Sequence, residues 1–211
     1  MSRRIPLAVI LALGLLASAC GSQRTEPVLL SDDFSETGSG WEQIENETGS
    51  ANYVDGSFHI LLNHPNDYLL SNYGQPFDGD VSVEVDARKI EGTNDNYFGV
   101  VCRYQDADNF YMLLITSRGR SAIGMMRDGE FGLISPGLEP LEMEGIKLDS
   151  ATNHIRADCV GDQLTLYANG KQVSLAYDSS FVGGLVGLVA ANGQIASKLD
   201  IRFDDFRVYQ P

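Results

Sequence analysis

Two carboxylates spaced two residues apart, Glu84 and Asp86, are candidates for acid–base chemistry. Glu84 and Asp86 lie in a stretch whose apolar and polar residues alternate, so both side chains should share one face of a β-strand. Retaining hydrolysis of a glycosidic bond requires two carboxyl groups about 5 Å apart. The next residue on this face is Arg88, and the next acid, Glu91, comes after the alternation ends. The pattern therefore predicts a polar strand face and not a catalytic pair.

The other catalytic and metal-binding patterns are incomplete. The sequence contains no Gly-x-Ser-x-Gly nucleophile motif, and its three histidines, His59, His64 and His154, lack the spacing of a metal site or a catalytic triad. The stretch that starts at Asp106 begins like an EF-hand loop, but Tyr111 stands where that loop requires glycine. We interpret the stretch as a turn, in which Asp and Asn side chains bond to the nearby backbone.

Aromatic and polar side chains in the first half of the chain could bind a sugar. Carbohydrate recognition requires an aromatic surface that stacks on the sugar, with polar groups that align its hydroxyls. The candidates are Trp41, Asn94, Asn96, Tyr97 and Arg103. Tyr97 and Arg103 are the first choice, because strand alternation should turn both away from the apolar face that carries Cys102. The alternative for each aromatic residue is packing in a strand or in the core.

The first nineteen residues have the features of a secretory signal peptide. Two arginines precede an apolar run that is too short to span a membrane and that ends in small residues. The stretch LASACG resembles the bacterial lipoprotein box, in which the cysteine, here Cys20, is lipidated and becomes the new N-terminus. We therefore expect residues 1–19 to be removed and residues 20–30 to tether the protein to a membrane, on the extracytoplasmic side of the cell envelope. The alternative is an ordinary secretory signal that leaves Cys20 as a thiol.

The two remaining cysteines are Cys102 and Cys159. In an exported protein, such a pair is best interpreted as a disulfide. Each cysteine alternates with apolar neighbours, which predicts a bridge buried between strands. The alternative is two buried free thiols.

Charge and composition limit the partners and the number of domains. The chain carries a formal net charge of −14, which becomes −16 when residues 1–19 and their two arginines are removed. Such an acidic protein is a poor partner for nucleic acid or for a bare anionic surface. Because no shift in composition divides the remainder, residues 31–211 are predicted to form one domain.

Short strands separated by turns are the elements that must position these residues. Turn dipeptides between apolar stretches predict hairpins, and they are Asp55-Gly56, Asp128-Gly129, Gly161-Asp162 and Asn169-Gly170. No window of useful length has the 3.6-residue apolar period of a helix. The sequence therefore predicts an all-β protein with about a dozen strands in two sheets.

Six stretches taken in order carry a family resemblance: FSETGSGW, YVDGSFHI, FGVVCRYQDADNFYMLLI, NHIRADCVGDQLTLYANGKQV, GGLVGLVA and FDDFRVY. Together they resemble the concanavalin A-like lectin/glucanase superfamily, and in particular the laminin-G-like jelly rolls of bacterial lipoproteins. The resemblance spans nearly all of residues 31–209 and implies a two-sheet antiparallel jelly-roll sandwich. It says little about function, because this fold carries lectins, glycosidases and adhesion modules alike.

The same resemblance suggests a metal site. Several jelly-roll relatives bind structural calcium through carboxylates of the first and last strands, and this chain begins and ends its folded part on Asp-Asp-Phe. The four terminal aspartates, as we call them below, are Asp32, Asp33, Asp204 and Asp205. Their oxygens are the hard ligands that calcium prefers. The alternative is that two paired terminal strands expose their acids to water.

Taken together, the sequence favours a non-catalytic, membrane-anchored module that binds carbohydrate or another cell-surface ligand. Two alternatives remain open at this point. One is a glycoside-active enzyme of the same fold with a divergent site, and the other is a structural module for protein interaction.

Overall fold

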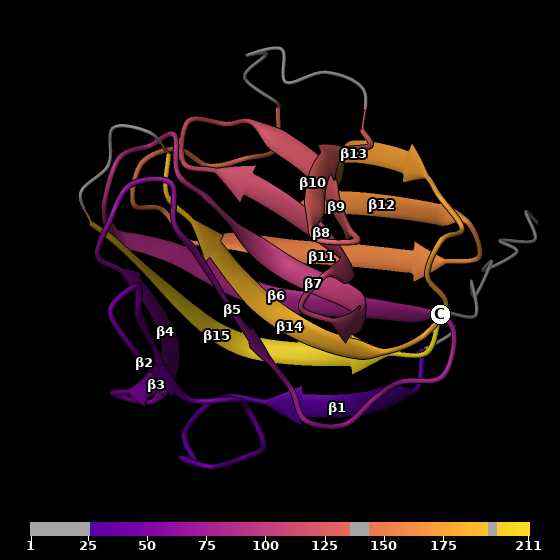
Figure 1. Cartoon of the computed structure of the whole chain (residues 1–211), viewed down its shortest axis with the longest axis horizontal. Coiled ribbons are helices and arrows are strands. Elements are labelled where there is room, and N and C mark those ends of the chain that lie inside the picture. Colours follow the sequence, from indigo (N-terminus) through magenta and orange to yellow (C-terminus); the bar gives the residue numbers. More distant parts are fainter. Residues whose placement is uncertain (1–25, 136–143, 194–197) are drawn as a thin grey trace, which may run out of the picture.

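The computed structural model describes residues 26–135, 144–193 and 198–211 (Figure 1). These residues form fifteen strands and no helix, so nothing in the described part of the chain has the length and hydropathy of a membrane-crossing helix. The strands build two antiparallel sheets that pack face to face. The prediction of a two-sheet jelly-roll sandwich is confirmed.

The larger sheet has nine strands and lies behind the smaller one in Figure 1. Its order is β13 (Lys171–Tyr177), β12 (Gln163–Ala168), β11 (Asn153–Val160), β6 (Val81–Glu91), β15 (Leu199–Tyr209), β4 (Ser57–Leu62), β3 (Gly49–Val54) and β2 (Ile44–Glu45). The ninth strand, β1 (Val28–Asp32), also pairs with β15. The two longest strands, β6 and β15, therefore lie side by side at the centre of the sheet.

The smaller sheet has six strands. Its order is β10 (Glu130–Leu133), β9 (Ser121–Arg127), β8 (Asn109–Thr116), β7 (Tyr97–Asp106), β14 (Leu185–Ala191) and β5 (Tyr68–Asn72). Strands β7 to β10 follow one another in the chain and in space, whereas β14 and β5 arrive from distant parts of the sequence. The two stretches that end the chain, β14 and β15, belong to different sheets.

The core between the sheets follows from period-two alternation. On β6, Val81, Val83, Val85 and Ala87 are buried in the core, as the sequence predicts. Apolar residues from both sheets fill the same interior, which removes them from water and supplies the main driving force for folding.

All four predicted hairpin turns are confirmed. They connect β3 to β4, β9 to β10, β11 to β12 and β12 to β13. At the first of these turns, Asp55 and Gly56 have φ angles of 50° and 72°. Positive φ at both central residues is the type I′ geometry, whose twist matches that of the flanking strands.

The first and last strands are neighbours, as expected from the repeated Asp-Asp-Phe. Strand β1 runs antiparallel to β15, and Asp32 lies opposite Phe206. Both Phe203 and Phe206 are buried, although they are three residues apart and alternation would bury only one of them. The reason is a bulge between them, where Asp205 has a φ of 51° and the pairing with β6 shifts.

The folded domain begins earlier than the sequence suggests. We predict a tether over residues 20–30, but β1 starts at Val28, and the backbone N–H of Gln210 donates to the carbonyl of Pro27. The last three residues of that tether thus belong to the sandwich. The predicted signal peptide and the predicted lipidation site, Cys20, lie outside the described residues.

The predicted disulfide is present. It joins Cys102 on β7 to Cys159 on β11, and both cysteines are fully buried. Because β7 and β11 belong to different sheets, the bridge crosses the core and links the two layers. It closes a loop with a sequence separation of 57 residues.

Candidate functional site

The outer face of the six-stranded sheet is unusually apolar. An antiparallel sheet that packs on one side commonly shows polar side chains on the other. Here a second cluster of buried residues covers the outer face, separate from the core, and it comprises Val101, Phe110, Met112, Leu114, Met126 and Val189. This cluster, which we call the outer cluster, indicates that something covers this face.

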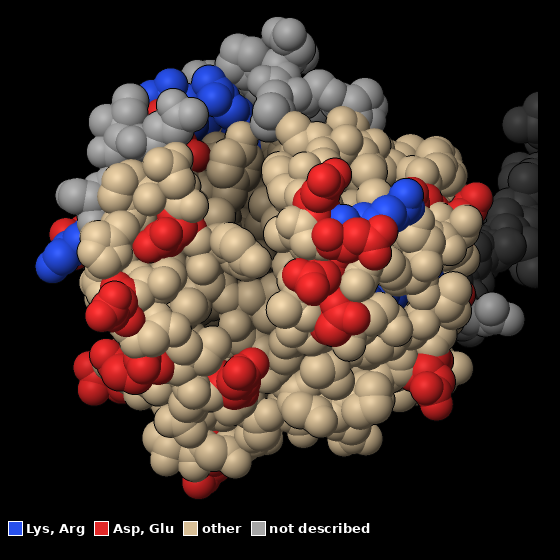
Figure 2. Space-filling view, viewed as in Figure 1, with Lys and Arg blue, Asp and Glu red and all other residues tan. Residues whose placement is uncertain are grey.

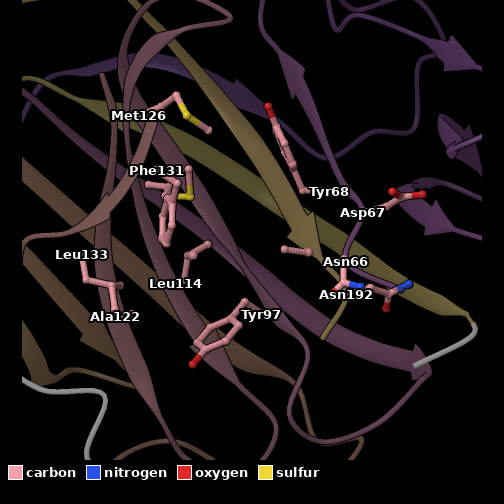
Figure 3. Close-up of a pocket in the computed structure, with 12 residues that line it drawn as sticks. Asn66, Asp67, Tyr68, Tyr97, Leu114, Ala122, Met126, Phe131, Leu133 and Asn192 are labelled. Carbon is pink, nitrogen blue, oxygen red and sulfur yellow. The ribbon is translucent and has the colours of Figure 1, made fainter. Parts of the chain in front are cut away.

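A furrow crosses this face, and acidic side chains lie on both of its sides (Figure 2). Its apolar part, which we call the apolar hollow, has a volume of about 270 Å³. Strands β7 to β10 supply most of its lining, with Met112, Leu114 and Ala122 among the residues that line it. On the opposite side lie residues of β5 and of the end of β14 (Figure 3).

Three aromatic residues line the apolar hollow: Tyr68, Tyr97 and Phe131. Tyr68 and Phe131 are exposed and lie on opposite sides of the furrow, while Tyr97 is half-buried on β7 (Figure 3). The ring of Phe131 packs over Gly124 of β9, where a Cβ would come within 2.6 Å of it. A side chain at position 124 would therefore displace this ring from its place on the wall of the furrow.

Burial raises the pKa of the Tyr97 hydroxyl above its ordinary value. The nearby charge of Asp95 raises this pKa further, and that of Arg120 lowers it. The phenol therefore stays protonated at neutral pH and can donate a hydrogen bond to a ligand.

One buried amide side chain that lines the apolar hollow has a hydrogen-bond donor with a partner and an acceptor without one. Asn192 is only 8% exposed, and its Nδ2 donates to the backbone carbonyl of His64 over 2.8 Å. Its Oδ1 has no hydrogen-bond partner among the described residues. Because a buried acceptor without a partner is costly, this oxygen marks a place where a ligand donor would be favourable.

A second, more polar hollow adjoins the first. This polar hollow has a volume of about 490 Å³ and shares Asn66, Asp67 and Tyr68 with the apolar hollow. Its other polar lining residues include Glu42, Asn72, Tyr104 and residues of the β2–β3 turn. The two hollows therefore form one continuous furrow, apolar at one end and acidic at the other.

Of the residues that the sequence nominates for ligand binding, Tyr97 is the one that lines the furrow. Arg103 is not on the face of Tyr97, because it has a φ of 53° at a bulge where the pairing of β7 with β8 shifts. The bulge turns Arg103 into the interior, where it is 1% exposed. It also turns Tyr104 outward onto the outer cluster, although alternation predicts that Tyr104 shares the inward face of Cys102.

Trp41 lies in the core and not in the furrow. It is buried, and its Nε1–H donates to the Oδ2 of Asp32 over 2.9 Å. Its ring meets that of Phe206 edge-on, with the centroids 4.7 Å apart. Trp41 thus holds the first and last strands together.

The two asparagines before β7 hold loops together. Asn94 donates from Nδ2 to Asp149 over 2.7 Å and accepts a hydrogen bond from Lys89. Asn96 is buried and accepts through Oδ1 from the backbone N–H of Gly193, at 3.1 Å. Neither side chain lines the furrow.

The four terminal aspartates do not form a calcium site. Asp32 accepts hydrogen bonds from the N–H of Phe34 and from Ser39 and Trp41, while hydrogen bonds from Ser35 lower the pKa of Asp33. The other two lie on β15, where they pair with Arg202 and Arg207 respectively. No group of three or more acidic, histidine or cysteine side chains suited to a metal occurs in the described part of the chain. Since calcium takes six to eight oxygen ligands, the residues do not fit this ion.

The carboxylates considered first, Glu84 and Asp86, lie on the nine-stranded sheet and so away from the furrow. Glu84 pairs with Arg156 at 3.4 Å, and Asp86 lies 2.7 Å from Nδ1 of His154. Acidic side chains of β6 thus pair with arginine and histidine side chains of the neighbouring strand β11, as the prediction of a polar strand face implies.

The residues that build the floor and the far wall of the furrow were not predicted. The stretch that forms β8 carries the available signal, because it is apolar on both faces. Tyr111, Leu113 and Ile115 face the core, while the residues between them join the outer cluster. A strand that is apolar throughout indicates that both of its faces are covered.

Comparison with known proteins identifies the fold. No protein-family model matches the chain, and no curated protein matches its sequence. Among solved structures, carbohydrate-binding module CBM66 from Bacillus subtilis is 18% identical with a TM-score of 0.53, over 81% of this chain and 96% of that one. A Bacillus subtilis protein of unknown function with a galectin-like fold is 14% identical with a TM-score of 0.63, over 88% and 97%.

A third similar structure is an enzyme. The Bacillus licheniformis β-glucanase is 11% identical with a TM-score of 0.60, over 89% of this chain and 100% of that one. These likenesses confirm the concanavalin A-like jelly-roll fold. At such identities they establish the fold alone, and the function has to be argued from the furrow.

Proposed function

We propose that this domain binds a carbohydrate chain along the furrow of its six-stranded sheet and does not catalyse a reaction on it. The observation that carries the proposal is the apolar hollow, in which the rings of Tyr68, Tyr97 and Phe131 border a space that is open to solvent. Sugar rings present apolar C–H faces and polar edges, so they suit a site with aromatic walls and a few directed polar groups.

The polar groups of the apolar hollow support this reading. The unpartnered Oδ1 of Asn192 would accept a hydrogen bond from a sugar hydroxyl, and the protonated Tyr97 hydroxyl would donate one. The similarity of the fold to a structure described as a carbohydrate-binding module is consistent with this role.

The direct test is a glycan array probed with the full chain, purified in a detergent without sugar headgroups. We expect binding to at least one glycan, with affinity reduced roughly tenfold in Tyr97→Ala, because stacking contacts and burial are lost. The matched control is Tyr177→Ala, since Tyr177 is an exposed tyrosine on β13 of the other sheet. Binding to no glycan, or equal losses in both variants, would contradict the proposal.

We also propose that the protein is a lipoprotein, anchored through Cys20 to a membrane on the extracytoplasmic side. The support is the sequence around Cys20, together with a domain that begins only a few residues later at β1. Two or more acyl chains would hold the domain at the membrane almost permanently. Cells fed labelled palmitate should incorporate it into the wild type and not into Cys20→Ala, and an unlabelled wild type would refute the anchor.

A further inference from the structure

The polar hollow points to a more specific ligand than a neutral sugar. We propose that it binds the protonated amine of an amino sugar, so that the preferred ligand is a glycan with free amino groups. This inference rests on the proposed function. It places one sugar unit of the bound glycan at the acidic end of the furrow, while the neighbouring sugar units occupy the apolar hollow.

The first argument is an unsatisfied acceptor on a side chain that lines the polar hollow, with its oxygen packed against Gly187 of β14. Asn72 on β5 is 6% exposed, and its Oδ1 has no hydrogen-bond partner among the described residues. An orphaned amide oxygen can only be satisfied by a donor. An ammonium group carries three donors and no acceptor, so it matches this oxygen better than a hydroxyl does.

The second argument is charge. The carboxylates of Glu42 and Asp67 line the polar hollow, and no lysine or arginine lines either hollow among the described residues. The imidazole of His64, which lies 3.5 Å from Asp67, is the nearby group that could compete for that carboxylate. Two carboxylates and a net charge of −14 attract a cation and repel an anionic glycan.

The hydroxyl of Tyr104, which lines the polar hollow, is compatible with a bound amine. Burial raises the pKa of the Tyr104 hydroxyl, the negative charge of Glu42 raises it further, and a hydrogen bond with the Asn72 side chain lowers it. Asp106 and Tyr68 act in the same direction as Glu42. The phenol of Tyr104 therefore stays neutral, and its oxygen can accept a hydrogen bond from the bound amine.

The third argument is continuity. Asn66, Asp67 and Tyr68 line both hollows, so one oligosaccharide can place a ring against the aromatic walls and the next ring at Asp67. In Figure 3 the Asp67 carboxylate lies on the side of the furrow opposite Phe131 and Met126. The amine would therefore bind at the acidic end while the apolar hollow holds the neighbouring sugar.

The test compares two tetramers that differ only in N-acetylation. Calorimetric titration of the full chain with the glucosamine tetramer and with the N-acetylglucosamine tetramer is done at a pH at which the free amine is protonated. We expect the glucosamine tetramer to bind roughly tenfold more tightly, which is the factor that one charge-assisted hydrogen bond of modest strength supplies. In Glu42→Gln, Asp67→Asn and the double variant, this preference should fall toward unity.

The matched control is Glu45→Gln, an exposed acid on β2 that does not line the polar hollow and that should keep the preference. Equal binding of the two tetramers, or tighter binding of the acetylated one, would overturn the amine assignment and leave carbohydrate binding intact. Binding of other neutral glycans, but of neither tetramer, would also overturn the amine assignment and leave carbohydrate binding intact. If no glycan of any kind binds, the proposed function fails, and the amine assignment fails with it.

Discussion

Replacing Arg103 with methionine should destabilise the domain strongly, although the residue touches no part of the furrow. From Nη1 the guanidinium donates to the carbonyls of Gly161 and Phe181, at 2.9 and 3.1 Å. From Nη2 it donates to the carbonyl of Cys159 and to Asp80, both at 3.1 Å. One side chain of β7 thus ties together the β11–β12 turn, the segment before β14 and the loop before β6.

The magnitude follows from what methionine leaves behind. The Cys159 carbonyl is buried and loses this donor, which costs about 1–3 kcal/mol, and the lost charge-assisted bonds at the other acceptors add about 1.5 kcal/mol or more each. Removing a buried charge offsets part of this loss, because the guanidinium no longer has to be desolvated. Asp80 is half exposed and recovers water. We therefore expect a net loss of about 3 kcal/mol, which lowers the Tm by roughly 6–12 °C in a domain of this size.

Guanidinium chloride unfolding of the wild type and of Arg103→Met measures this loss as a lower midpoint with an unchanged m value. Arg118→Met is the control, because Arg118 is an exposed arginine paired with Asp95 at 3.0 Å and should contribute about 0.5 kcal/mol or less. A loss below about 1 kcal/mol in Arg103→Met would refute the structural role. If Arg103→Met is as stable as the wild type but binds no glycan, the result would instead support the sequence-based hypothesis that Arg103 contacts the ligand.

Two further predictions concern covalent and metal stabilisation. Replacing Cys102 and Cys159 together by alanine should lower the free energy of unfolding by about 4 kcal/mol on the chain-entropy model, since the bridge closes a loop of 57 residues. Chemical unfolding measures this loss, and a loss below about 1 kcal/mol would contradict the prediction. Calcium or a chelator should shift the Tm by less than about 1 °C, because the four terminal aspartates already have protein partners; a calcium-dependent rise of several degrees would show a site that these side chains do not reveal.

The sequence predicts the layers well because alternation and turn chemistry are local. Val81, Val83 and Val85 face the core as their spacing indicates, and each of the four predicted turn dipeptides lies at a hairpin. The pairing of the first and last strands is also correct, because the repeated Asp-Asp-Phe places similar strands at both ends of the folded part. The alternation and the turns depend on residues a few positions apart, whereas the pairing of the terminal strands is inferred from a repeated motif.

The predictions fail where a bulge reverses the alternation. Arg103 and Asp205 both have positive φ, and each adds a residue that shifts every later side chain to the other face. No glycine marks either position, so a count of alternating residues cannot locate the shift. This single cause explains why Arg103 lies in the core, why Tyr104 faces outward and why both Phe203 and Phe206 are buried.

The sequence feature that relates to the furrow is a strand without alternation. Strand β8 is apolar on both faces, which requires a cover on its outer side, and the β9–β10 hairpin supplies part of that cover through Phe131. The rest of the floor stays open between this ring and β5, where Asn72 and Asn192 keep unpartnered oxygens within the described part of the chain. Apolar surface left uncovered and acceptors left without donors both cost free energy in the absence of a ligand. A ligand with an apolar ring face and hydrogen-bond donors relieves both costs at once, and for this reason a sugar fits the furrow better than a purely apolar ligand.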